Sequence, residues 1–74
     1  MTTHATTSQA VLIRKMMASH VFTDEERAGL ERRLAEGFTR GTPSDAITWL
    51  KAELAMRKAA EREAAERQQV GLNL

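Results

Sequence analysis

The apolar residues in the first third of the chain recur at the spacing of one helix face, which predicts a helix over residues 7–20. Thr6 precedes it, and Gln9 follows three residues later, the signature of a capping box. His20 falls in the expected last turn, where a positive charge meets the negative end of the helix dipole. The apolar face consists of Leu12, Ile13, Met16 and Met17.

A second helix is expected over residues 24–36, with Thr23 as its N-cap and Glu26 completing another capping box. Its apolar stripe is thin. We expect Gly37 to end the helix in the left-handed αL conformation and Phe38 to fold back on the last turn. The stripe consists of Ala28 at its edge, Leu30 and Leu34.

The third helix has two possible starts. Thr42 is a good N-cap because Pro43 then occupies the first helical position and Asp45 the third. Thr39 is the alternative, which still leaves Pro43 in the first turn. No helix breaker occurs before Gly71, so this helix should have about 25 residues and extend well beyond the other two.

These elements predict an all-α fold, in which two short antiparallel helices pack on the first half of a long C-terminal helix. The expected organisation is a disordered N-terminus over residues 1–5 and a three-helix core over 6–56. A charged helical extension over 57–69 follows, and then a loose tail over 70–74. Pairs of opposite charge four residues apart, Glu53–Arg57 and Glu63–Arg67, support the extension.

The third helix carries two apolar stripes instead of one. At about 100° per residue, Ile47, Leu50 and Leu54 lie on one side of the helix. The other stripe has the 3-4-3 spacing of a helix–helix contact, with small residues beside two large ones. We interpret it as a binding surface for a partner; the alternative is that the tryptophan packs at the edge of the core. This second stripe consists of Trp49, Ala52, Met56 and Ala59.

Composition limits what the core can contain. The 74 residues are 42% hydrophobic but only 4% aromatic, so the core is small and its stability low. Val21 and Phe22 are expected to close one corner of it. The chain has no cysteine and no apolar leader segment, which favours a cytoplasmic location. No apolar run approaches the roughly 20 residues that cross a bilayer.

Two stretches, ATTSQAVLIRKMM and FTRGTPSDAITWLKA, resemble a small helical module of high-GC bacteria and their phages. The pattern of that module is A-T-x-x-Q-x-x-x-I-R-x-L-L, a variable helix, and T-K-x-x-A-S-x-x-I-x-x-L. The resemblance covers about residues 5–52 and mostly concerns caps and core, so it implies a fold and no established function. A looser analogy is to SAP-type DNA-binding modules. Matching positions are Ala5, Thr6, Gln9, Ile13, Arg14, Thr39, Ser44, Ile47 and Leu50; Met16, Met17, Arg40 and Pro43 depart from the pattern.

Candidate catalytic groups are few. His4 and His20 are the only histidines, and we interpret both as structural or solvent-exposed. Ser19 and His20 are adjacent on a predicted helix, so their side chains diverge and do not form a nucleophile–base pair. Convergent metal-ligand spacing is absent from the sequence. We therefore expect no enzyme activity, no metal or other cofactor, and no small-molecule substrate.

Basic residues occur in three small groups: Arg14 with Lys15, Arg32 with Arg33, and Arg40. The net charge is only +1 because acidic residues are interleaved, which argues against strong non-specific binding to nucleic acid. Arg14, Lys15 and Arg40 would meet if the Arg40 link packed near the first helix. The preferred function is therefore a protein–protein interaction module, an accessory or regulatory factor binding another protein or a second copy. A DNA-associated module is the alternative.

Overall fold

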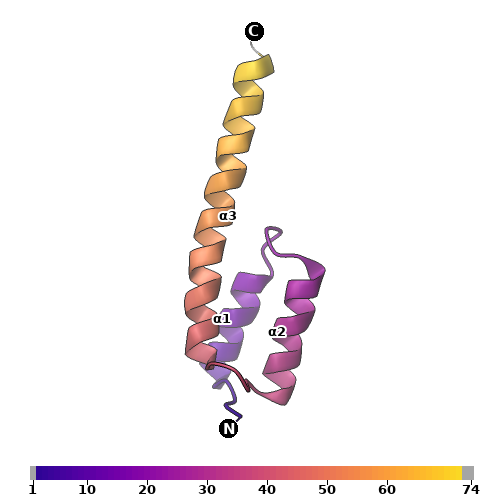
Figure 1. The fold of residues 1–74 in the computed structure, drawn as a ribbon, viewed down its shortest axis with the longest axis vertical. Coiled ribbons are helices and arrows are strands. Elements are labelled where there is room, and N and C mark those ends of the chain that lie inside the picture. The colour runs from indigo at the N-terminus through magenta and orange to yellow at the C-terminus, as the bar shows by residue number, and fades with distance from the viewer. Residues whose placement is uncertain (1, 73–74) are drawn as a thin grey trace.

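The computed structural model describes residues 2–72, and the side chains of residues 2–67. Its helices are α1 (Thr7–Met17), α2 (Asp24–Glu36) and α3 (Pro43–Leu72). α1 and α3 run in the same direction, and α2 runs the opposite way beside them (Figure 1). The predicted all-α class, with short helices packed on the first half of a long C-terminal one, is confirmed.

A threonine capping box starts each helix. The threonine hydroxyl accepts a hydrogen bond from the backbone N–H three residues on, and that later residue's side chain accepts one from the threonine N–H. Oxygen–nitrogen distances are 2.9–3.2 Å. Thr42 rather than Thr39 is thus the start of α3. The capping pairs are Thr6–Gln9, Thr23–Glu26 and Thr42–Asp45.

α1 ends at Met17, three residues before the predicted end at His20. The guanidinium of Arg27 explains the early end, because it donates to the carbonyl oxygens of Met17 at 2.9 Å and Ser19 at 3.0 Å. These carbonyls therefore have partners outside the helix. His20 lies in the following turn, so the predicted contact with the α1 dipole is wrong; its ring instead meets Glu61 of α3 at 2.7 Å.

The core lies where α1 packs against both other helices. Phe22 is buried, as predicted, and Leu50 is completely buried. Leu12 was expected on the packed face but is exposed, since the core side of α1 is centred on Ile13 and Met17. The buried apolar residues are Ile13, Met16, Met17, Phe22, Leu30, Phe38, Ala46 and Leu50.

Residues 2–5 are ordered by pairing, contrary to the disorder predicted for the N-terminal segment; residue 1 lies outside the described part. Thr3 and Phe38 exchange two backbone hydrogen bonds, of 2.9 and 2.7 Å, in an isolated antiparallel bridge. Gly37 ends α2 as expected, but with φ 100° and ψ 164° rather than in αL. Residues with a side chain rarely adopt this φ, and a Cβ on Gly37 would also require the methyl group of Thr2 to move, so glycine is strongly favoured here. This backbone directs Phe38 into the core.

α3 is longer than predicted. It has 30 residues and continues through Gly71 to Leu72, so the prediction that a loose tail begins at residue 70 is wrong. Residues 73–74 of that predicted tail lie outside the described part. The molecule is consequently 57 Å long and only 19 Å across. The described side chains of residues 58–67 are all exposed. The folded unit nevertheless reaches beyond the expected boundary at residue 56, because Arg57 contacts the α1–α2 loop.

Candidate interaction surface on the long helix

Two faces of α3 differ sharply in exposure. Leu50 is 0% exposed and Ala46 9%, whereas Trp49 is 42% and Met56 63% exposed. Ala52 and Ala59 are also exposed. We call the surface formed by Trp49, Ala52, Met56 and Ala59 the outer face. The structure therefore leaves the predicted partner-binding stripe largely uncovered.

Trp49 lies at the border of the core rather than behind it. Its ring centroid is 6.1 Å from that of Phe22, and the guanidinium of Arg57 lies over both rings. Of the predicted inner stripe of Ile47, Leu50 and Leu54, Leu50 is completely buried, whereas Ile47 and Leu54 are only half-buried. Burial of Ala46 shifts the packed side of α3 toward Trp49. One edge of the indole is thus packed and the other faces solvent.

Arg57 connects α3 to the rest of the domain. Its guanidinium donates to both carboxylate oxygens of Glu26, at 2.7 and 2.8 Å, and to the carbonyl oxygen of Val21 at 3.1 Å. Hydrogen bonds from Arg57, and then from the Thr23 N–H, lower the pKa of Glu26 from 4.5 to about 2. The ion pair with Glu26 raises the pKa of Arg57.

Sequence reasoning missed this role of Arg57, since local spacing offered only Glu53 as its partner. That local contact exists but is longer, at 3.7 Å. The available signal was Glu26, a capping-box acid with a second oxygen free to bind a distant cation. The guanidinium of Arg57 lies against the rings of Phe22 and Trp49, so it restrains the orientation of Trp49 in the outer face.

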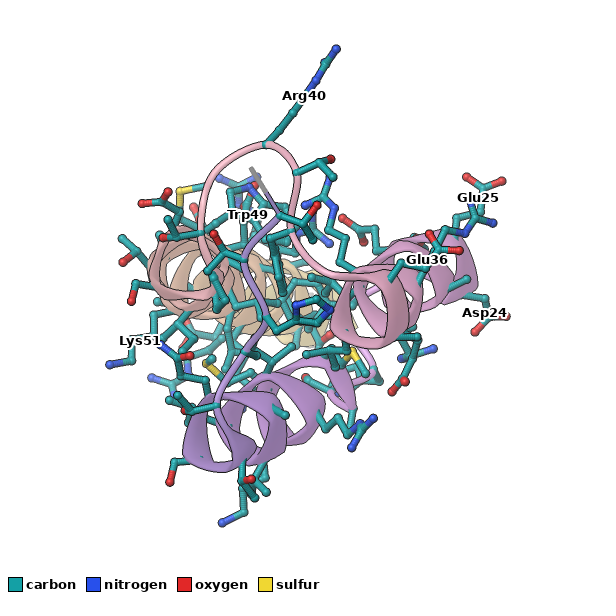
Figure 2. The ribbon with its side chains drawn as sticks, turned by 90° about the horizontal axis from the view of Figure 1, so that it is seen from below. Asp24, Glu25, Glu36, Arg40, Trp49 and Lys51 are labelled. Carbon is teal, nitrogen blue, oxygen red and sulfur yellow. The ribbon has the colours of Figure 1, made fainter. Side chains whose placement is uncertain are left out.

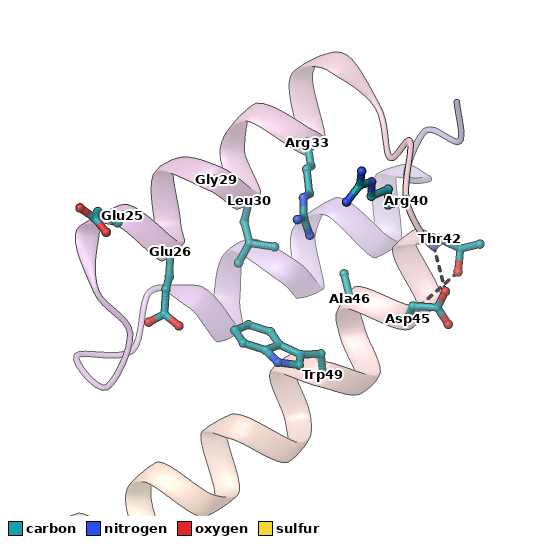
Figure 3. A pocket seen from close by; sticks show the side chains of 10 residues that line it. All are labelled: Glu25, Glu26, Gly29, Leu30, Arg33, Arg40, Thr42, Asp45, Ala46 and Trp49. Atoms are coloured by element: carbon teal, nitrogen blue, oxygen red, sulfur yellow. Dashed lines mark hydrogen bonds between the residues drawn. The ribbon is translucent and has the colours of Figure 1, made fainter. Parts of the chain in front are cut away.

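A groove of about 510 Å³ separates α2 from α3 beside Trp49 (Figure 3). In the described part of the chain, no Cα atom of α2 lies within 8 Å of one in α3. A Cβ built on Gly29 would meet nothing within 4 Å, so the α2 wall is open there. Its lining residues are Glu25, Glu26, Gly29, Leu30, Arg33, Arg40, Thr42, Asp45, Ala46 and Trp49.

The two ends of this groove differ in charge. Arg33 and Arg40 lie at the end near the α2–α3 link, and Glu25 at the other (Figure 3). Among the described side chains, neither arginine has a carboxylate within 4.0 Å. In the view along the bundle, Arg40 projects away from the helices (Figure 2). Arg33 and Arg40 can therefore bind an anionic group without first losing an ion pair to another described side chain.

The predicted cluster of Arg14, Lys15 and Arg40 does not form. Arg14 and Lys15 are in the last turn of α1, at the end that leads into the α1–α2 loop. Arg40 lies in the link at the opposite end of the bundle (Figure 1). Arg14 also pairs with Glu31 at 3.3 Å. The cations of the alternative DNA-binding hypothesis are therefore separated, because the link pairs with the N-terminal segment and not with the end of α1. Arg32 is exposed on α2.

Within the described residues, no group of three or more His, Asp or Glu side chains converges as metal ligands would. None of the described helices is long and apolar enough to cross a membrane. No protein-family model matches the chain, and no curated protein or solved structure matches it either. A functional interpretation therefore depends on the outer face and the groove.

Proposed function

We propose that the protein is a non-enzymatic interaction module that binds a protein partner through the outer face of α3. The observation that carries this proposal is the exposure of Trp49 and Met56, which are 42% and 63% exposed on the same face of α3. Within this proposal the module acts as an accessory or regulatory factor, a role on which the resemblance to the bacterial and phage module has no bearing.

The chemistry of this surface supports a protein partner. Trp and Met are enriched in the centres of interfaces, where they supply large contact areas. Ala52 and Ala59 alternate with them along α3, so another backbone can approach closely between the two anchors. The groove beside Trp49 continues this surface toward α2 and adds depth to it. Such a shape suits a helix laid along α3.

Met56 contributes little to the fold, and Trp49 contributes only through its packed edge. Met56 belongs neither to the buried core nor to the partly buried apolar residues that pack against the core. Only 4% of the chain is aromatic, yet its single tryptophan is left half-exposed. A protein with so small a core gains stability by burying this ring fully, so its exposure supports a use outside the monomer.

The test replaces Met56 by a charged residue. We expect Met56→Glu to weaken partner binding about 30-fold or more, equivalent to the roughly 2 kcal/mol of a central interface residue. The control is Lys58→Glu, which places the same charge on an exposed position of α3 away from the outer face. Binding is measured by retention of the host's proteins, and of the chain itself, on immobilised variants whose helicity is checked. Equal retention by both variants contradicts the proposal.

DNA association through Arg14, Lys15 and Arg40 is the second hypothesis, and their separation in the fold weakens it. Phosphate contacts dominate such binding, so it predicts a gel shift at low salt that disappears as salt is added. Replacing the three cations together should abolish the shift. A shift that survives Met56→Glu but not the triple change would favour DNA over a protein partner.

A further inference from the structure

We propose that the partner on the outer face is a second copy of this chain, with the two α3 helices antiparallel and the extension of each copy seated in the α2–α3 groove of the other. This inference rests on the proposed function and specifies its partner. It draws on three features of the described residues: the spacing along the outer face, the open wall at Gly29, and the distribution of charge.

Spacing along α3 favours the antiparallel register. When the helices cross near residue 54, Trp49 of one copy faces Ala59 of the other, and Ala52 faces Met56. Each large side chain is then opposite a small one, as close packing of two helices requires. Residues 43–65 of the two helices overlap, a seam about 33 Å long. The extension is long enough to reach the whole groove of the other copy.

The groove has room for this extension. α2 and α3 are separated, and Gly29 leaves the α2 wall without a side chain where it faces the gap. Because Gly29 has no side chain, a helix seated here can approach the backbone of α2 closely. The extension presents small residues, Ala59 and Ala60, at that level. The incoming helix completes a four-helix arrangement around the core.

Charge supports the same register. The antiparallel seam carries Glu63 and Glu66 of one copy to the groove end that holds Arg33 and Arg40 of the other. Neither arginine has an acidic partner within 4.0 Å among the described residues of its own copy. Glu63 is 64% exposed within its own i,i+4 pair and is free to contact a second cation. Glu63 and Glu66 thus bring two further acids to the groove end that holds Arg33 and Arg40, where Asp45 is already engaged by Thr42 as the capping residue of α3.

A parallel dimer does not meet these conditions. It places Trp49 against Trp49 and Glu63 against Glu63, so large side chains collide and like charges oppose each other along the seam. It also directs both extensions away from the bundles, which leaves Arg33 and Arg40 unmatched. The antiparallel arrangement instead places each large side chain opposite a small one and brings Glu63 and Glu66 near Arg33 and Arg40.

Disulfide trapping tests the register, because the chain has no cysteine of its own. We expect Ala52→Cys mixed with Met56→Cys to form a mixed disulfide on oxidation, with little cross-linking of either variant to itself. Self-linked Ala52→Cys would contradict the antiparallel arrangement, since those sites are then too far apart. Lys58→Cys, on an exposed position on the side of α3 opposite the outer face, is the control for random oxidation. Mass spectrometry distinguishes the three products.

Charge exchange tests the groove contact. Arg33→Glu with Arg40→Glu in one chain, and Glu63→Arg with Glu66→Arg in another, should each weaken self-association about tenfold or more. Mixing the two chains should restore it, because both reciprocal contacts are complementary again. Sedimentation velocity measures all three samples. Failure of the mixture to recover, when each variant alone is weakened, contradicts the proposed seating of the extension.

A wild-type chain that stays monomeric at roughly 1 mM would overturn the second copy as partner. That result leaves the proposed function to be decided separately, by whether Met56→Glu abolishes binding to a different protein. Self-association that Met56→Glu does not alter would contradict both proposals, since the contact would then lie elsewhere on the molecule.

Discussion

The inner and outer faces of α3 carry similar apolar residues but differ in what covers them. Leu50 is completely buried against the other helices, whereas Met56, less than two turns further along, is 63% exposed. Trp49 lies between these extremes, with one edge packed on Phe22 and the other beside the groove. Two short helices therefore cover only part of the apolar surface that α3 presents.

The largest expected effect lies on the inner face. Leu50→Ala should lower the free energy of unfolding by about 2–5 kcal/mol, because it removes a fully buried side chain and leaves a cavity. Such a loss is enough to unfold a domain of this size. Urea denaturation followed by circular dichroism measures it. Met56→Ala is the matched control and should change stability by less than about 0.5 kcal/mol. Similar losses for both would abolish the distinction between the faces.

Trp49→Ala should lower the free energy of unfolding by an intermediate amount, about 1–2 kcal/mol. It removes the contacts with Phe22 and Arg57, but the ring that is lost is only partly buried. This intermediate value agrees with the alternative from the sequence, in which the tryptophan packs at the edge of the core, more than with a purely external position. The same denaturation experiment ranks the three positions. A loss as large as that of Leu50→Ala would assign Trp49 to the core.

The Glu26–Arg57 ion pair gives the border between the faces a pH dependence. The pKa of Glu26 is lowered from 4.5 to about 2, so its contribution to stability is present above pH 4.5 and is lost as the pH falls toward 2. Thermal unfolding between these values should show Glu26→Gln with a shallower dependence than the wild type. Parallel slopes for the two chains would show that the pair is not formed. Glu31→Gln is the control, because Glu31 belongs to an exposed ion pair.

The smallest effect is expected from removing residues 61–74. Among the described side chains of this segment, the contact to the rest of the domain is the exposed pair of Glu61 with His20, and exposed pairs contribute about 0–1 kcal/mol. The shortened chain should still unfold cooperatively, with nearly unchanged stability at low concentration. It should also associate more weakly with itself, because it lacks Glu63 and Glu66. Loss of cooperative unfolding would mean that the extension belongs to the core.

Local signals explain what the sequence could predict. The capping boxes at Thr6 and Thr23 involve residues three apart, so they located two helix starts correctly. The early end of α1 was missed because it depends on Arg27, ten residues from the carbonyl that it binds. The bridge between Thr3 and Phe38 was missed for the same reason.

The candidate surface was predictable in part. Helical spacing identified the four residues of the outer face, since exposure on a long helix follows from its period. The groove was not predictable, because it depends on the separation of α2 from α3, which no local pattern encodes. The grouping of Arg14 with Arg40 failed similarly: it required the link to pack beside the end of α1, and the link lies at the other end.

Quenching of the single tryptophan by acrylamide, measured as a function of protein concentration, tests most directly whether the outer face is an interface. At roughly 1 μM, Trp49 should be partly accessible, in keeping with its 42% exposure, and it should become protected as the concentration approaches about 1 mM. Met56→Glu should keep the accessibility of the dilute protein throughout. Full protection of Trp49 in the dilute chain, or constant quenching while the chain associates, would contradict the account.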